Sequence, residues 1–221
     1  PAEMLRGFLL NKKINSINLK DLTEVGHYGM YEFAKSCSTL ETIDLSNLET
    51  IGDYGLAYMF LNDKNIKFCD LSKIKTVGNY ALYGMFSYAG SAELDISFDS
   101  LETIEGNSNV FQNFASGGIF NTISFPKLKA GGFFQFALSA TVNKISFEVL
   151  EEADLNSAFS NSKVKELDFP GLKKITNANS MCKGCKYLTN INLNSLETAH
   201  RLTFDKSFEG CTSLSTISFP S

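Results

Sequence analysis

Two cysteines separated by two residues, Cys182 and Cys185, form the pair in this sequence whose type and spacing could do chemistry. Such a pair can supply two ligands to a metal ion or cycle between a dithiol and a disulfide. Structural zinc takes four protein ligands, and the two histidines, His27 and His200, lie far apart in the chain. We therefore expect buried structural thiols, with a local disulfide as the alternative, and we expect no metal site and no cofactor.

Motifs for catalysis are missing from the sequence. It contains no Gly-x-Ser-x-Gly elbow, no Walker-type phosphate loop and no Gly-x-Gly-x-x-Gly turn. Neither histidine stands in a recognisable frame with a serine or cysteine nucleophile, although nucleophilic catalysis requires a base within hydrogen-bond reach. We expect no catalytic residues, and we predict that the protein is not an enzyme.

The amino-acid composition excludes several further classes of protein. The 221 residues carry a formal net charge of -4, and 43% of them are hydrophobic. A nucleic-acid binder would need a basic face, and a disordered chain would have fewer apolar residues. The longest apolar runs fall far short of the roughly 20 residues that a membrane helix needs. The composition predicts an ordered protein that neither binds nucleic acid nor inserts into a membrane.

An internal repeat dominates the chain. The segment from Leu40 to Ile51 has apolar residues at its first, fourth, sixth, ninth and twelfth positions, and this frame recurs throughout. The frame starts lie 22 to 27 residues apart, near residues 14, 40, 66, 93, 120, 142, 164, 188 and 214. Cys37, Cys185 and Cys211 each precede a start by three residues, which is typical of small buried side chains. Residues 1–221 are expected to form a single repeat domain and to be a segment of a longer protein.

The fourth and sixth positions of the frame predict a short strand with one buried face, because polar residues surround them. One strand per repeat in constant phase stacks into a parallel sheet along a solenoid. Tyr28, Tyr54 and Tyr80 recur in the variable stretch after the twelfth position, and we interpret this aromatic stripe as core behind helical turns. The expected fold class is an α/β repeat solenoid, a right-handed coil with one parallel sheet of about nine short strands and short helical or irregular back segments.

The repeat is similar to a known family. The segments 51–56 (Ile-Gly-Asp-Tyr-Gly-Leu), 77–82 (Val-Gly-Asn-Tyr-Ala-Leu) and 207–220 (Ser-Phe-Glu-Gly-Cys-Thr-Ser-Leu-Ser-Thr-Ile-Ser-Phe-Pro) resemble the BspA-like leucine-rich repeat. Its unit runs Phe-x-x-Cys-x-x-Leu-x-x-Ile-x-Ile-Pro and then Ile-Gly-x-x-Ala-Phe. The resemblance covers residues 14–221 and weakens between 102 and 141. It implies a leucine-rich-repeat solenoid, a location at the cell surface or outside the cell, and adhesion or binding to extracellular macromolecules.

The exposed side of the predicted strands is the candidate binding surface, because solenoids commonly bind along a concave face. The alternative is a solvated face on which small polar residues allow close stacking, and only Phe68 among these positions is aromatic. The clustered acids Asp44, Asp70, Asp95 and Asp99 could bind a cation or a basic partner. The candidate residues are Asn18, Thr42, Asp44, Phe68, Asp70, Asp95, Ser97, Ser124, Lys144, Ser146, Glu166, Asp168, Asn190 and Asn192.

The leading hypothesis for function is a non-enzymatic recognition module that binds a protein or glycan partner. The alternative is a structural spacer that holds another domain away from a cell envelope. The final repeat stops after its strand motif without a polar cap, so we also expect end-to-end self-association through an open strand edge. The absence of any Asn-x-Ser/Thr sequon favours a bacterial source.

Overall fold

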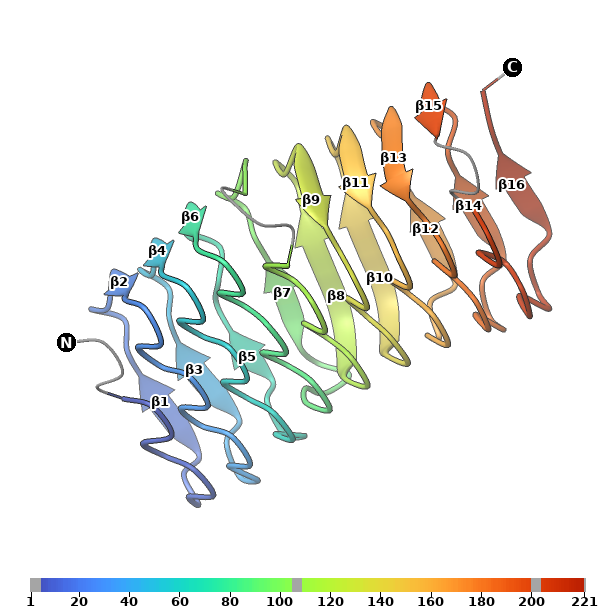
Figure 1. Cartoon of the computed structure of the whole chain (residues 1–221). Coiled ribbons are helices and arrows are strands. Elements are labelled where there is room, and N and C mark those ends of the chain that lie inside the picture. The colour runs from blue at the N-terminus through green and yellow to red at the C-terminus, as the bar shows by residue number, and fades with distance from the viewer. Residues whose placement is uncertain (1–4, 105–108, 200–203, 221) are drawn as a thin grey trace.

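The computed structural model describes residues 5–104, 109–199 and 204–220, which wind into a solenoid of stacked turns. The two chain ends lie at opposite ends of the stack (Figure 1). Each turn of the coil, or rung, has a front strand, in most rungs a second strand, and a back run of consecutive tight turns. Rungs 1 to 9 are numbered by their front strands.

The front strands form where the fourth and sixth positions of the frame predict them. Neighbouring strands are parallel and in register, with Ile17 opposite Ile43 and Ile123 opposite Ile145. They form two sheets, β1-β3-β5 and β7-β8-β10-β12-β14-β16, so the expectation of one nine-stranded sheet is wrong. The front strands are β1 (Ser16–Asn18), β3 (Thr42–Asp44), β5 (Phe68–Cys69), β7 (Asp95–Ser97), β8 (Ile119–Phe125), β10 (Thr141–Phe147), β12 (Glu166–Asp168), β14 (Asn190–Asn192) and β16 (Thr216–Ser218).

A second row of strands, which the sequence pattern does not predict, runs beside the front row (Figure 1). It forms around the apolar twelfth position of the frame, where Val25 lies opposite Ile51 and Ile51 opposite Val77. Most of these strands are too short to show an alternating pattern. They are β2 (Glu24–Val25), β4 (Thr50–Ile51), β6 (Thr76–Val77), β9 (Ala130–Gly132), β11 (Glu152–Asp154), β13 (Lys174–Asn177) and β15 (Thr198–Ala199), in sheets β2-β4-β6 and β9-β11-β13-β15.

The back runs are not helical, which corrects the expected α/β class: no helix occurs in the described ranges. In rung 1 the backbone is left-handed at every fourth residue, with φ between 51° and 59°, at Tyr28, Glu32 and Ser36. Such residues break an α-helix. Amide donors alternate instead: Phe33 N–H donates to the Met30 carbonyl of its own run, whereas Ala34 N–H donates to the Met59 carbonyl of rung 2 (3.1 Å each). The back run therefore also joins one rung to the next.

Phenylalanines fill the core of the middle rungs. The sixth-position rings stack rung on rung, with centroids 5.0 to 5.4 Å apart, in the column Phe98, Phe125, Phe147 and Phe169. Phe111 and Phe133 of the back runs pack against this column almost perpendicularly. Leu94 is fully buried and Glu93 is exposed, so Leu94 takes the first position of rung 4, while Ile96 and Phe98 keep their expected places in the frame.

The tyrosine stripe is not core, contrary to its interpretation from the sequence. Phe33, Phe60 and Phe86 are buried, but Tyr28, Tyr54 and Tyr80 are only half-buried. Their rings stack on one another at 4.8 and 4.9 Å along the outside of the coil. The reason is their backbone: among the described residues, every non-glycine residue with positive φ is partly or fully exposed.

Candidate binding face

The candidate surface residues lie together on the outer side of the front row, and none of them is buried. They form two columns along the stack, because the front strands are parallel and in register. The first column is Thr42, Phe68, Asp95, Lys144, Glu166 and Asn190. The second is Asn18, Asp44, Asp70, Ser97, Ser124, Ser146, Asp168 and Asn192. We call these two columns the front face.

Much of the second column has a structural task, since its side chains terminate the front strands. In four of them, the side-chain Oδ1 accepts a hydrogen bond of 2.9 to 3.1 Å from the backbone N–H two residues later in the chain. These four are Asn18, Asp44, Asp70 and Asn192. This is the local turn that Asn and Asp side chains favour. Hydrogen bonds from Ser46 lower the pKa of the Asp44 carboxyl below its ordinary value. The preference for Asn and Asp here follows from chain reversal.

Other front-face side chains bind one another between rungs. Ser124 and Ser97 join through their hydroxyls at 2.8 Å, and Asn192 Nδ2 donates to Asp168 at 2.9 Å. Asp95 accepts from two residues of rung 5, Asn121 and Thr122. These bonds support the alternative of a solvated, self-stacking face for this part of the front row.

A second group on the front face makes no such bonds and is free to meet a partner. Within the described residues, no side-chain hydrogen bond or ion pair involves Thr42, Lys144, Ser146, Glu166 or Asn190. Phe68 is the outlier, since half of this aromatic side chain (50%) is exposed on the sheet. Its neighbour in register on β3 is Thr42, a smaller side chain that leaves the ring uncovered on that side.

The front face is hollowed where β5 meets β7. A depression of about 470 Å³ lies between these strands, with Phe68 and Asp70 on one wall. Glu93, Asp95 and Asp99 line the other wall, which belongs to rung 4. The structure thus brings four candidate residues of the sequence analysis, Phe68, Asp70, Asp95 and Ser97, into one hollow. Asp99 lies outside the strand columns but belongs to the acid cluster of the sequence analysis, whereas Glu93 was not a candidate.

The cysteines occupy the positions expected of structural thiols. All five are free, and Cys211 alone is only half-buried. Cys185 Sγ donates to the Phe159 carbonyl at 2.9 Å, and Cys211 Sγ donates to the Cys182 carbonyl at 3.0 Å. Burial raises the pKa of the Cys182 thiol well above its ordinary value, whereas a hydrogen bond from Cys182 lowers that of Cys185. The local disulfide is absent from this structure.

Ladders of opposite charge, which the strand frame does not predict, run along the outside. Acid and base alternate at the tenth position of the frame through Glu49, Lys75, Glu102, Lys129, Glu151, Lys173 and Glu197. Lys75 pairs with Glu49 at 2.8 Å, and Lys173 pairs with Glu151 at 3.2 Å. Each such exposed pair adds little to stability, because water and salt screen it. The signal was readable in the sequence, as a sign that alternates with the repeat period.

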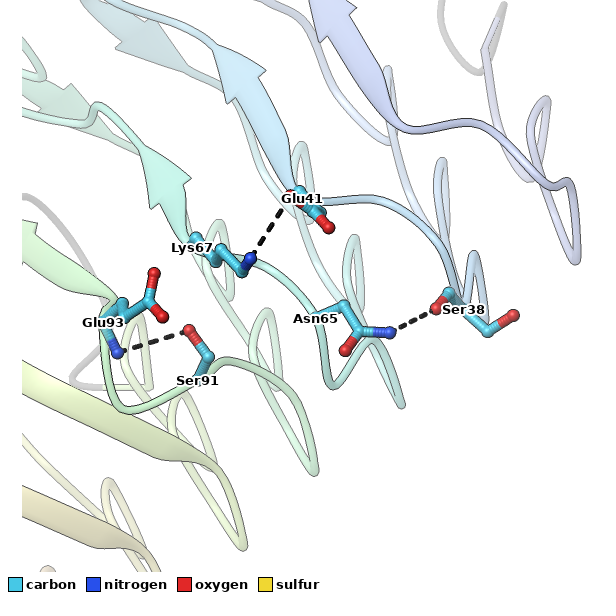
Figure 2. Close-up of polar contacts among 6 residues, drawn as sticks. All are labelled: Ser38, Glu41, Asn65, Lys67, Ser91 and Glu93. Atoms are coloured by element: carbon cyan, nitrogen blue, oxygen red, sulfur yellow. Dashed lines mark hydrogen bonds and ion pairs between the residues drawn. The ribbon is translucent and has the colours of Figure 1, made fainter.

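Similar links join rungs 2 and 3 beside the front strands (Figure 2). Asn65 Nδ2 donates to the Ser38 carbonyl at 2.6 Å, and Lys67 pairs with Glu41 at 3.4 Å. Rung 4 breaks the series: the Glu93 N–H donates to Ser91 Oγ of its own rung at 3.4 Å (Figure 2), and within the described residues no bond joins the Glu93 side chain to rung 3.

The described part of the chain has neither a metal-binding cluster nor a membrane-spanning helix. No group of three or more His, Cys, Asp or Glu side chains there is arranged to hold a metal ion. No helix in the same ranges is long and apolar enough to span a membrane. His27 lies 3.7 Å from Asp53, and His200 falls outside the described residues.

Comparison with known proteins identifies the repeat. No curated protein matches the chain. A solved structure, a leucine-rich cell surface protein from Faecalibacterium prausnitzii A2-165, is similar at 15% identity with a TM-score of 0.42, over 93% of this chain and 60% of that one. Residues 6–89 and 107–221 match the BspA type leucine-rich repeat region in six copies. The chain therefore belongs to the BspA-type leucine-rich repeat family.

Proposed function

We propose that the chain is a non-enzymatic recognition module, located at the cell surface or outside the cell, that binds a protein or glycan through its front face. The observation that carries this proposal is Phe68, an aromatic ring half exposed in a hollow of an otherwise polar sheet. Aromatic side chains at the centre of a hollow are the usual anchors of binding energy. Membership in the BspA-type family supports the location.

The front face also suits recognition because hydrogen-bond ladders within each front sheet, and between the back runs, hold the backbone beneath it. Parallel ladders join β7 to β16, and the back runs add a further set of bonds between rungs. A rigid scaffold lowers the entropy that binding must overcome. Catalysis is not part of the proposal, since neither the sequence motifs nor the surroundings of His27 supply a nucleophile with a base.

The second candidate function is a structural spacer. The Asx turns and the bonds between rungs favour it, because they explain many front-face residues without any ligand. Phe68, Lys144 and Glu166 are not explained in this way, and they support recognition over the spacer.

An array experiment separates the two functions. The whole chain is applied to arrays of glycans and of extracellular-matrix proteins, beside a variant that carries Phe68→Ser and Lys144→Ser. A variant with Lys163→Ser and Lys186→Ser, exposed residues outside the front face, is the matched control. We expect binding that the first variant loses and the control keeps. If the unmodified chain bound to nothing on either array, the structural spacer would remain as the function.

A further inference from the structure

Rungs 3 and 4 are the one place in the described ranges where both rows of strands are interrupted. β5 ends one front sheet and β7 begins the next, while β6 ends the first sheet of the second row. The two rungs nevertheless stay neighbours, because the back runs remain joined: Phe86 N–H donates to the Phe114 carbonyl at 2.8 Å. The stack therefore opens at the front and stays closed at the back.

The cause is extra chain in rung 4. Gly90 pairs with Ile119 and Asp95 with Thr122, so rung 4 takes five residue steps where rung 5 takes three. The surplus folds into a turn in which Leu94 N–H donates to the Ser91 carbonyl, and it leaves Glu93 on the outside. The BspA-type match omits residues 90–106, a stretch that includes this turn. Glu93 on the acidic wall therefore lies in the surplus turn, whereas Asp95 and Asp99 lie on and just after β7.

The lining of the hollow contains one aromatic side chain and a strong excess of negative charge. Phe68 presents half of its surface between Asp70 on its own rung and Glu93, Asp95 and Asp99 on rung 4. The single base in the lining, Lys67, extends toward Glu41 of rung 2 and away from Glu93 (Figure 2). Within the described residues the Glu93 carboxylate has no hydrogen-bond or ion-pair partner.

We propose that this hollow docks an arginine-bearing, extended peptide segment of a protein partner. An arginine guanidinium stacks on Phe68 as a cation on an aromatic face and pairs with the carboxylate of Glu93 or Asp70. Flanking basic residues of the segment meet Asp95 and Asp99, whose charges remain although their oxygens accept bonds from Thr122 and Ser97. This inference rests on the proposed recognition function and names the partner's chemistry.

The choice of arginine over other occupants follows from the lining. A glycan would need amide and hydroxyl partners spread across the hollow, but its walls carry four carboxylates. Lysine is a compact and strongly hydrated charge, whereas the planar guanidinium both stacks and binds a carboxylate in two-pronged fashion. The hollow is open and exposed, so we expect weak to moderate affinity that falls as salt rises.

Fluorescence anisotropy of a labelled hexa-arginine peptide tests the charge part of this inference. The unmodified chain is compared with a double variant, Asp70→Asn with Glu93→Gln, which keeps the size of both side chains. The matched control is Asp21→Asn with Glu24→Gln, two exposed acids of rung 1 that lie outside the front face and outside the hollow. We expect the first variant to bind at least fivefold more weakly and the control to change less than twofold. Equal losses in both variants would mean general attraction to an acidic protein and would overturn the proposal.

The aromatic part is tested with the same peptide and the variant Phe68→Ala. Tyr187→Ala is the control, since Tyr187 is similarly exposed (54%) but lies outside the hollow. We expect Phe68→Ala to weaken hexa-arginine at least fivefold, Tyr187→Ala to leave it unchanged, and hexa-lysine to bind more weakly than hexa-arginine. No effect of Phe68→Ala, or equal binding of the two peptides, refutes the site. A partner found on the arrays whose binding survives Asp70→Asn with Glu93→Gln refutes this site and leaves the proposed function standing.

Discussion

Asp63 is the residue through which pH should act on the stability of this solenoid. Its side chain is fully buried, and among the described residues neither carboxylate oxygen has a hydrogen-bond partner. It occupies the place that a thiol or hydroxyl takes in other rungs, where Cys37 Sγ donates to the Leu9 carbonyl at 2.8 Å and Cys185 Sγ to that of Phe159 at 2.9 Å. Burial raises the pKa of the Asp63 carboxyl from 3.8 to about 8, although the Cys37 amide lowers it.

The sign of the effect follows from the two pKa values. Between about pH 4 and pH 8 the carboxyl is protonated in the folded chain and ionised in the unfolded chain, so the folded chain holds more protons. Its contribution to stability is full below pH 4, falls as the pH rises, and is lost above pH 8. At about 1.4 kcal/mol per pH unit, raising the pH from 5 to 8 removes on the order of 4 kcal/mol.

Asp63→Asn is the perturbation that isolates this effect, because it keeps the shape and removes the charge. Urea unfolding is followed by circular dichroism at pH 5, 6, 7, 8 and 9 for the unmodified chain and the variant. Asp21→Asn, an exposed acid, is the control. We expect the urea midpoint of Asp63→Asn to exceed that of the unmodified chain increasingly from pH 5 to pH 8 and by a constant amount above. A difference that does not change with pH, or a variant less stable than the unmodified chain at pH 8, would refute the burial of an unpartnered acid.

Three further outcomes are expected. Ellman's reagent should react slowly with the native chain and find five thiols after denaturation, with or without reductant; two disulfides would contradict the thiol assignment. Gly90→Ala should destabilise by more than about 1 kcal/mol in urea unfolding, because φ is 85° and a Cβ would clash with the Ile119 carbonyl oxygen. Gly210→Ala, at φ 77°, should cost less, because a Cβ there would make only ordinary van der Waals contact with Gly184. The chain should self-associate in sedimentation velocity over a hundredfold concentration range through the open edge of β16, and Ile217→Lys with Phe219→Lys should abolish this; a strictly monomeric unmodified chain would disprove it.

The front face shows which residues of the candidate site the sequence pattern identifies and which it misses. Phe68, Asp70 and Asp95 were candidates from the sequence because they stand on the outward positions of predicted strands. Glu93 was not a candidate, since it was assigned to a core position of the frame. The physical cause is local: a turn closed by the Leu94 N–H and the Ser91 carbonyl places Leu94 in the core and Glu93 outside, while β7 keeps its expected register.

The sequence by itself determined the repeat, the phase of every front strand and the identity of most core residues. The reason is that side-chain burial along a strand alternates with a period of two, so the local pattern of apolar and polar residues is enough to locate each front strand. The tertiary structure alone decided that the front row splits after β5, that the back runs are left-handed turns, and that Asp63 is buried without a partner. These features depend on which residues of neighbouring rungs lie opposite each other, such as Asp63 beside the Cys37 amide, and that alignment is set by the length of every connection in between.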